Sequence, residues 1–141
     1  MFRTILTSVD LAEPELARPA IEKAVALAEA SGGALRLVNV QPLLPPTYMD
    51  YVPVGFDEQQ RAEAQGALQT LADKVPLPHD RVSCVVRIGG TYPEILAEAE
   101  EWGADLIVIC SHRPAMSTYL LGSTAKAVVR HAKCSVLVVR E

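Results

Sequence analysis

Aromatic residues are scarce in this chain of 141 residues: they make up 5% of it, although 50% of the residues are hydrophobic. Alanine and the aliphatic side chains must therefore fill the core. Positive charge is not in excess, since the formal net charge is −4 at pH 7. This balance argues against nucleic acid as a partner, because a general nucleic-acid binder needs a basic face to neutralise phosphates. No hydrophobic run approaches the roughly 20 residues that a membrane helix requires, so we expect no membrane insertion.

Cysteines are also few. Cys84, Cys110 and Cys134 are an odd and widely spaced set, which is most simply explained by reduced thiols in a cytoplasmic protein. The first residues carry no long hydrophobic region and no small-residue cleavage site, so we expect no signal peptide. The length predicts one domain over residues 1–141.

Five hydrophobic runs of strand length divide the chain. They cover residues 4–9, 34–40, 82–88, 106–109 and 136–139. The last two runs are unbroken rather than alternating, which is typical of strands that are covered on both faces.

Between these runs, hydrophobic residues recur at helical spacing. The four stripes are Ile21, Ala24, Val25 and Ala28; Leu68, Leu71, Ala72 and Val75; Ile95, Leu96, Ala99 and Trp102; and Ala125, Val128, Val129 and Ala132. Strands that alternate with helices predict an α/β fold. We therefore expect a single-domain, doubly wound, five-stranded parallel sheet of order 3-2-1-4-5 with helices on both faces.

Helix boundaries are marked less clearly. Capping signals start two helices, at Asp57 with Gln60 three residues on and at Thr91 with Glu94 three residues on. Glycines at 32 and 103 are placed to end helices. Prolines at 14 and 19 cannot both lie in one helix interior, so the regular part of the first helix is expected to begin near residue 17.

Polar residues follow the first and the fourth predicted strands. Ligands of an open parallel sheet bind beyond the carboxyl ends of the strands, where the strand order reverses. The residues at these two exits are Ser8, Val9 and Asp10, and Cys110, Ser111, His112 and Arg113. A second feature, the proline-rich connection of residues 41–56, is either a flap over a site or a loop that contacts a partner.

The stretch that opens the last helix has the features of an anion site. Gly122 precedes Ser123 and Thr124. Free N–H groups at a helix start bind anions, and glycine permits close approach. The two hydroxyls add donors, and Arg113 supplies positive charge. The same glycine and serine can equally be an ordinary helix cap, so both interpretations stay open.

Residues 5–10, 89–96, 111–114, 119–123 and 129–140 together resemble the universal stress protein family, and the resemblance covers essentially the whole chain. Nucleotide-binding members carry the pattern G-x2-G-x9-G-[ST]. Gly122 and Ser123 match its last part, while Cys110 and His112 stand where the earlier glycines would be. This form, with Ser-His-Arg-Pro in the loop, is similar to the F- and G-type branch, for which ATP binding is expected.

The resemblance implies an adenine nucleotide alpha hydrolase-like fold that binds ATP with Mg²⁺. Ser8, Val9 and Val40 would line the adenine pocket, and Asp10 would accept hydrogen bonds from adenine or ribose. The phosphates would meet Ser111, Arg113 and the backbone of Gly122, Ser123 and Thr124. From the sequence alone, Asp10 can also be a cap of the first helix.

A catalytic function has little support in the sequence. Neither a G-x-S-x-G elbow nor an H-E-x-x-H motif is present. Cys110 and His112 can share one side of an extended chain, but a cysteine nucleophile also needs a positioning group and an oxyanion site. We expect a protein that is not an enzyme, or at most a slow ATPase.

The predicted strand from Val136 to Val139 lies at an edge of the sheet without proline or an inward charge. Such an edge favours pairing with its own copy across a two-fold axis, and the resemblance implies the same homodimer. The alternative is an edge protected by Arg140 and Glu141. Three functions therefore stay open: an ATP-binding, dimeric stress-response protein with an unidentified regulatory protein partner, a nucleotide-free dimeric interaction module, and a slow ATPase.

Overall fold

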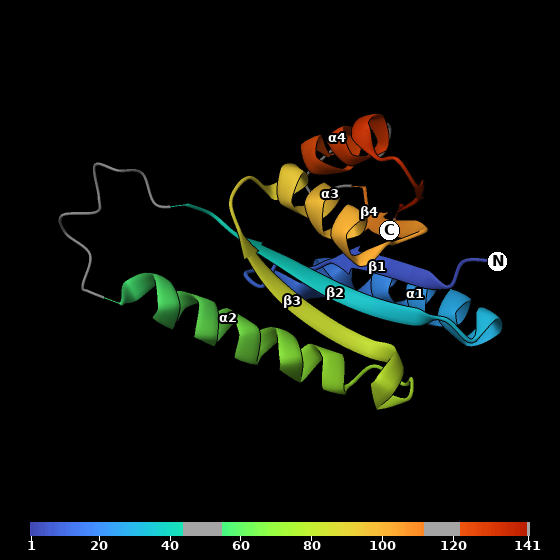
Figure 1. The fold of residues 1–141 in the computed structure, drawn as a ribbon, viewed down its shortest axis with the longest axis horizontal. Helices are drawn as coiled ribbons and strands as arrows, with labels where there is room; N and C mark the ends of the chain where they lie inside the picture. The colour runs from blue at the N-terminus through green and yellow to red at the C-terminus, as the bar shows by residue number, and fades with distance from the viewer. Residues whose placement is uncertain (44–54, 112–121, 141) are drawn as a thin grey trace.

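The computed structural model describes residues 1–43, 55–111 and 122–140. Their strands form one parallel sheet of order β3-β2-β1-β4-β5, which confirms the predicted order (Figure 1). The strands are β1 (Thr4–Ser8), β2 (Ala34–Gln41), β3 (Val82–Ile88), β4 (Leu106–Cys110) and β5 (Ser135–Val139). Each end lies within about one residue of its predicted position, because continuous hydrophobic runs of this length have few alternatives.

Helices cover both faces of the sheet, as predicted. The helices are α1 (Arg18–Ser31), α2 (Phe56–Asp73), α3 (Thr91–Trp102) and α4 (Ser123–His131), with short 3₁₀ turns η1 (Pro14–Ala17) and η3 (His79–Arg81). Helices α1 and α2 lie on one face, and α3 and α4 lie on the other (Figure 1). The alternation of strand and helix along the chain gives the α/β fold that the sequence indicated.

The core is divided by the sheet into two hydrophobic clusters. Ile5 and Leu37 face α1 and α2, whereas Leu6 and Val38 face α3 and α4; all four side chains are fully buried. Adjacent residues of a strand point to opposite faces, so a strand buried on both sides needs apolar residues throughout. One position of the predicted stripes is not part of the core: Val129 of α4 is 47% exposed, whereas Ala125 and Val128 of the same stripe are buried.

The structure corrects the predicted caps of α2 and α3. Their N-cap residues are Gly55 and Gly90, neither helix has a side-chain cap, and Thr91 is the first helical residue. The Glu94 side chain lies against Gly89, but its carboxylate accepts a hydrogen bond of 2.7 Å from Arg87 of β3 and caps no amide of α3 among the described residues. The predicted start of α1 is confirmed within one residue, since η1 takes up Pro14 and the α-helix begins at Arg18.

Glycine is required at two kinds of position. Gly32 and Gly103 follow α1 and α3 with φ of 72° and 82°, the left-handed region that favours glycine. Gly33 is needed for close approach instead, because a Cβ atom there would lie 2.5 Å from the carbonyl oxygen of Arg3. Ala34 donates a hydrogen bond of 2.8 Å to that same oxygen, which joins the starts of β1 and β2.

Helix α3 is anchored to the sheet by a buried carboxylate. Glu98, which is 5% exposed, accepts hydrogen bonds from Arg36 of β2 at 2.7 Å and from Arg87 of β3 at 2.8 Å. Arg87 also pairs with Glu94 and Glu101, and these carboxylates raise its pKa. A buried carboxylate is tolerated when both of its oxygens are paired in this way.

Thr7 offers a test of the core. Its side chain is fully buried on β1, and its hydroxyl has no hydrogen-bond partner among the described residues. Because a buried hydroxyl without a partner costs about 1–3 kcal/mol, Thr7→Val should raise the free energy of unfolding by about 1 kcal/mol, measured by urea denaturation.

Thr70→Val is the matched control. Thr70 is exposed on α2, and its hydroxyl donates a hydrogen bond of 3.0 Å to the carbonyl of Gly66. This substitution should bring no gain in stability. A Thr7→Val protein that unfolds at lower urea concentration than the wild type would show that the hydroxyl has a partner after all.

Candidate functional site

A crevice of about 590 Å³ opens at the carboxyl ends of β1 and β4. The strand order reverses at this point, which is where ligands of open α/β sheets bind, and the volume lies within the roughly 300–1,000 Å³ that is usual for ligand sites. Eight of the nine predicted site residues line it: Ser8, Val9, Asp10, Val40, Ser111, Gly122, Ser123 and Thr124. The ninth, Arg113, lies outside the described residues, as do His112 and most of the connection of residues 41–56.

The floor of the crevice is hydrophobic. Val9 follows the last residue of β1 and is 3% exposed, Ile109 lies in β4 and is 4% exposed, and Val40 lies near the end of β2. Val9 packs in the cluster on the α1 and α2 face, whereas Ile109 and Val40 pack on the α3 and α4 face. The amide of Val9 donates a hydrogen bond of 2.8 Å to the carbonyl of Val38, which continues the pairing of β1 with β2 past the last residue of β1. This floor can hold a flat, apolar group at the strand ends.

Ser111 brings the start of α4 to the crevice. Its amide donates a hydrogen bond of 2.9 Å to the carbonyl of Val139, and its own carbonyl accepts a hydrogen bond from the amide of Gly122. The residue after β4 and the residue before α4 are therefore in direct contact. The amide of Gly122 is already used by this bond, so the free donors at the start of α4 begin with Ser123 and Thr124.

Asp10 lies at the exit of β1 and is exposed. Its Oδ1 accepts a hydrogen bond of 2.9 Å from the amide of Ala12, and its carbonyl accepts one of 3.1 Å from Glu13. The N-cap positions of η1 and α1 are Glu13 and Ala17. The interpretation of Asp10 as the cap of the first helix is therefore wrong, and the carboxylate stabilises the turn that leads away from the crevice.

Several lining residues were not predicted from the sequence. They are Leu16, Ala17, Thr91, Ile95, Ile109 and Ala125, whereas Cys110, which also lines the crevice, was named among the residues at the exit of the fourth strand. Thr91 and Ile95 belong to α3, whose first turn was interpreted only as a cap and a hydrophobic stripe. The available signal was the glycine pair before Thr91, because the exit of β3 leads α3 toward the same edge of the sheet as β1 and β4.

Within the ranges that the structure describes, no group of three or more His, Cys, Asp and Glu residues is placed to hold a metal ion. No helix among these residues is both long and apolar enough to cross a membrane.

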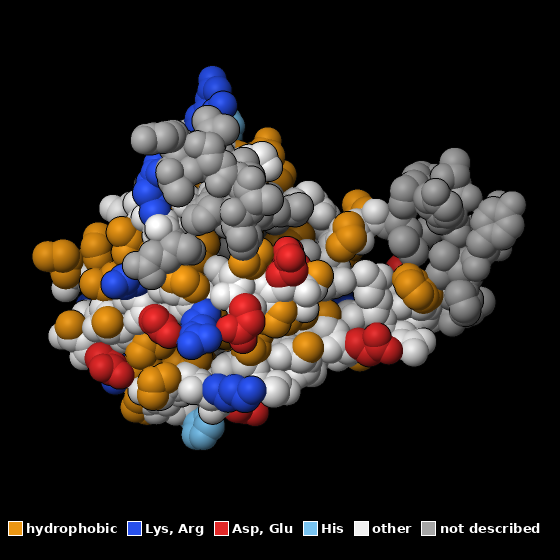
Figure 2. Space-filling view, turned by 180° about the vertical axis from the view of Figure 1, so that it is seen from behind, with side chains coloured by type: hydrophobic (Ala, Val, Ile, Leu, Met, Phe, Trp, Pro, Cys, Tyr) orange, Lys and Arg blue, Asp and Glu red, His pale blue; other side chains and the backbone are white. Residues whose placement is uncertain are grey.

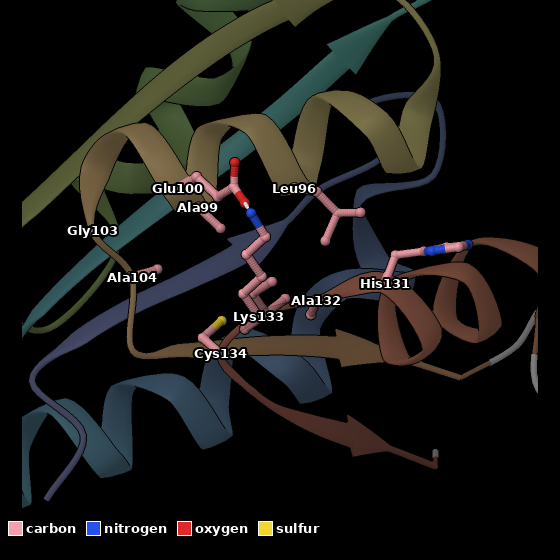
Figure 3. Close-up of a pocket in the computed structure, with 10 residues that line it drawn as sticks. Leu96, Ala99, Glu100, Gly103, Ala104, His131, Ala132, Lys133 and Cys134 are labelled. Carbon is pink, nitrogen blue, oxygen red and sulfur yellow. Dashed lines mark ion pairs between the residues drawn. The ribbon is translucent and has the colours of Figure 1, made fainter.

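A second hollow, of about 220 Å³, lies between the end of α3 and the connection from α4 to β5 (Figure 3). Lys133 extends to Glu100 and pairs with it at 2.9 Å. The thiol of Cys134 lies in this hollow, and burial raises its pKa. Burial likewise raises the pKa of Cys84 on β3.

Figure 2 shows the opposite side of the molecule from Figure 1, where acidic and basic side chains are interspersed with hydrophobic ones.

The doubly wound sheet and a crevice at its switch point define an α/β protein with a ligand site at the ends of β1 and β4. Comparison with known proteins identifies the family. The profile of the Universal stress protein family matches residues 1–140, so the chain belongs to this family, and the resemblance drawn from the sequence is confirmed.

The relatives agree on the branch and on the fold. Universal stress protein G of Escherichia coli O157:H7 is 38% identical over 99% of this chain and 100% of its own length, which confirms the F- and G-type branch. The crystal structure of the hypothetical protein PH0823 is 29% identical, with a TM-score of 0.77 over 100% of this chain and 97% of that one. A universal stress protein in complex with cAMP is 20% identical, with a TM-score of 0.63 over 99% and 97% of the two chains.

The two thiols with raised pKa values give a pH prediction. A raised pKa means a smaller thiolate fraction at neutral pH, and the thiolate is the reactive form. Cys84 and Cys134 should therefore react with iodoacetamide more slowly in the folded protein than in urea, as measured by mass spectrometry of the labelled peptides. The folded protein's rate should still rise with pH where the unfolded protein's rate has levelled off. Equal rates in the two states at pH 8 would contradict the raised pKa values.

Proposed function

We propose that this protein binds an adenine nucleotide, ATP with Mg²⁺, in the crevice, and that the bound nucleotide regulates its contacts with a partner protein in the stress response. The observation that carries the proposal is the meeting of a hydrophobic floor and a helix start in one crevice. A nucleotide has the matching chemistry, with a flat base at one end and a polyanion at the other. The complex of a universal stress protein with cAMP shows that the fold accommodates an adenine nucleotide in that protein.

The base fits the hydrophobic end of the crevice. Val9 and Val40 would contact the two faces of adenine, with Ser8 beside them. Asp10 would accept hydrogen bonds from the base or the ribose, since Ala12 occupies only its Oδ1 among the described residues.

The phosphates fit the start of α4. The helix N-terminus carries partial positive charge, and the amides and hydroxyls of Ser123 and Thr124 are donors there. Gly122 contributes by the absence of a side chain, and Ser111, which is 1% exposed, would lie beside the phosphates. Arg113, which lies outside the described residues, would supply positive charge to the phosphates. Mg²⁺ would be held mainly by the phosphate oxygens and water, because it keeps several waters and seldom needs a protein cage.

A nucleotide-free interaction module is the second candidate function. Cys110 lines the crevice, and it stands where nucleotide-binding members of the family have glycine. Equilibrium binding of labelled ATP to nucleotide-stripped protein separates the two functions, because the module would show no saturation at millimolar ATP. A phosphate-release assay then tests for slow ATPase activity, which a rate equal to that of buffer would exclude.

We also propose that the protein acts in the cytoplasm, as a single domain that forms a homodimer through β5. Strand β5 is an edge of the sheet, and Leu137 on it is 38% exposed. An exposed hydrophobic edge is stabilised by pairing with a second copy. None of the three cysteines forms a disulfide in the described part of the chain, as expected in a reducing compartment.

Substitution at Gly122 tests the phosphate end. Its φ of −61° and ψ of 155° are accessible to any residue, so Gly122→Val should fold. The new side chain should keep the phosphates from the amides of α4. Because a charge-assisted hydrogen bond contributes about 1.5–3 kcal/mol, ATP should bind at least about tenfold more weakly in calorimetric titration.

Gly66→Val is the matched control, since Gly66 is exposed on α2 and a Cβ atom there would have nothing within 4 Å. It should bind ATP as the wild type does. Unchanged ATP affinity in folded Gly122→Val would place the phosphates elsewhere.

Substitution on β5 tests the homodimer. Leu137→Lys puts a charge on the edge strand and should convert the dimer to a monomer, as measured by light scattering after size exclusion. The control Val129→Lys introduces the same charge at an exposed hydrophobic position on α4 and should leave the dimer intact. A wild-type protein with the mass of one chain, or a dimer that survives Leu137→Lys, would exclude this interface.

A further inference from the structure

Three side-chain amides form a continuous chain of hydrogen bonds from α2 to the crevice. Gln60 of α2 donates to the Oε1 of Gln41 at 2.9 Å, and Gln41 donates to the Oδ1 of Asn39 at 2.6 Å. Asn39 then donates to the backbone carbonyl of Val9 at 2.8 Å. We call this set, Gln60, Gln41, Asn39 and the carbonyl of Val9, the amide chain.

The direction of the amide chain is fixed at the crevice end. The carbonyl of Val9 can only accept, so Asn39 must turn its NH₂ group toward it and its oxygen toward Gln41. The same argument then fixes Gln41 and Gln60. All three amide dipoles point the same way, and hydrogen bonds aligned like this strengthen one another. Reversal of one amide would place two oxygens or two NH₂ groups face to face.

The two ends of the amide chain lie in different environments. Asn39 is 3% exposed, and its acceptor belongs to Val9, which lines the crevice and precedes Asp10. Gln60 is only partly buried. It lies near the start of α2, beside the carboxyl end of β2; Figure 1 shows both leading into the connection drawn in grey.

The start of α2 depends on this contact more than the rest of the helix does. The buried residues of α2 are Ala64, Leu68 and Ala72, all beyond its first two turns. The Gln60–Gln41 hydrogen bond therefore tethers the part of α2 that precedes them. A shift of that part of the helix would break the bond from Gln60 to Gln41. The amide of Gln41 would then be less firmly held, and so would Asn39, which bonds to the carbonyl of Val9.

We propose that Asn39 is a positioning residue for the crevice, and that the amide chain makes ligand affinity depend on the placement of the start of α2. Its regulatory part rests on the proposed nucleotide binding. The carbonyl of Val9 belongs to the peptide that links Val9 to Asp10, so Asn39 fixes the orientation of this peptide at the base end. A partner that moves α2 would thereby change the affinity for the nucleotide.

Gln60 is the position to test, because Asn39 is buried and its replacement can prevent folding. Gln60→Ala removes the outer hydrogen bond. Gln60→Glu is more disruptive, because a carboxylate can only accept a hydrogen bond. The side-chain amide of Gln41 would turn its NH₂ group toward the carboxylate and its oxygen toward the Oδ1 of Asn39. Gln59→Ala is the matched control: Gln59 is the preceding glutamine on α2, is exposed, and bonds to Glu63 at 3.3 Å.

The first measurement needs no nucleotide. Amide resonances of Val9, Asp10 and Ala12 in the ¹H–¹⁵N spectrum of the free protein should shift in Gln60→Ala and shift further in Gln60→Glu. Those of Ser123 and Thr124 should stay in place, and Gln59→Ala should match the wild type throughout. Unmoved resonances at Val9 and Asp10 in both Gln60 variants would overturn the positioning role.

The second measurement is ATP affinity by calorimetry. Loss of one hydrogen bond should weaken binding about two- to tenfold in Gln60→Ala, with no change in Gln59→Ala. If the resonances shift but the affinity does not, the regulatory part is overturned. If wild-type protein binds no ATP while the resonances still shift, the proposed nucleotide binding fails and the positioning of Val9 by Asn39 stands.

Discussion

Strand β1 lies between β2 and β4, and the crevice exists because of this placement. The connection after β1 crosses one face of the sheet and the connection that leads to β4 crosses the other, so the strand ends are left uncovered between them. The carboxylate of Asp105 holds the start of β1 by accepting hydrogen bonds from Arg3 at 2.9 Å and Thr4 at 3.0 Å. At the other end, the amide of Val9 extends the pairing with β2. Hydrogen bonds within the protein thus hold both ends of β1 in place.

The position of α3 follows from a different kind of contact. Glu98 is paired with arginines of two strands, and Arg36 also lies 4.5 Å from the ring centre of Trp102. Two strands and one helix therefore share a single buried charge. Because removal of either arginine would leave that charge poorly compensated, the helix cannot slide along the sheet at low cost. Thr91 and Ile95 are held at the crevice as a result.

The sequence predicts the strands and most of the residues that line the crevice. Ile107 and Val108 lie in an unbroken hydrophobic run because β4 is covered on both faces, and parallel strands bring their carboxyl ends to one edge. The caps at Asp57 and Thr91 failed because the signal is local, whereas Glu94 is held by Arg87 of β3. The contribution of α3 and η1 to the crevice also depends on contacts between elements that no short motif encodes.

Helices α3 and α2 are joined to the sheet by contacts of unequal strength, and of the two only α3 contributes residues to the crevice lining. Helix α3 is joined to the sheet by several ion pairs that converge on Glu98 and Arg87, with both partners partly or fully buried. The start of α2 is joined to the sheet by a row of hydrogen bonds between neutral side-chain amides, and the outermost of these amides is the partly buried Gln60. Charge-assisted bonds are roughly twice as strong as neutral ones. Motion near the crevice should therefore begin at the start of α2, while α3 and the strand ends stay in place. Under the proposed ligand binding, that motion would act on the crevice through Asn39.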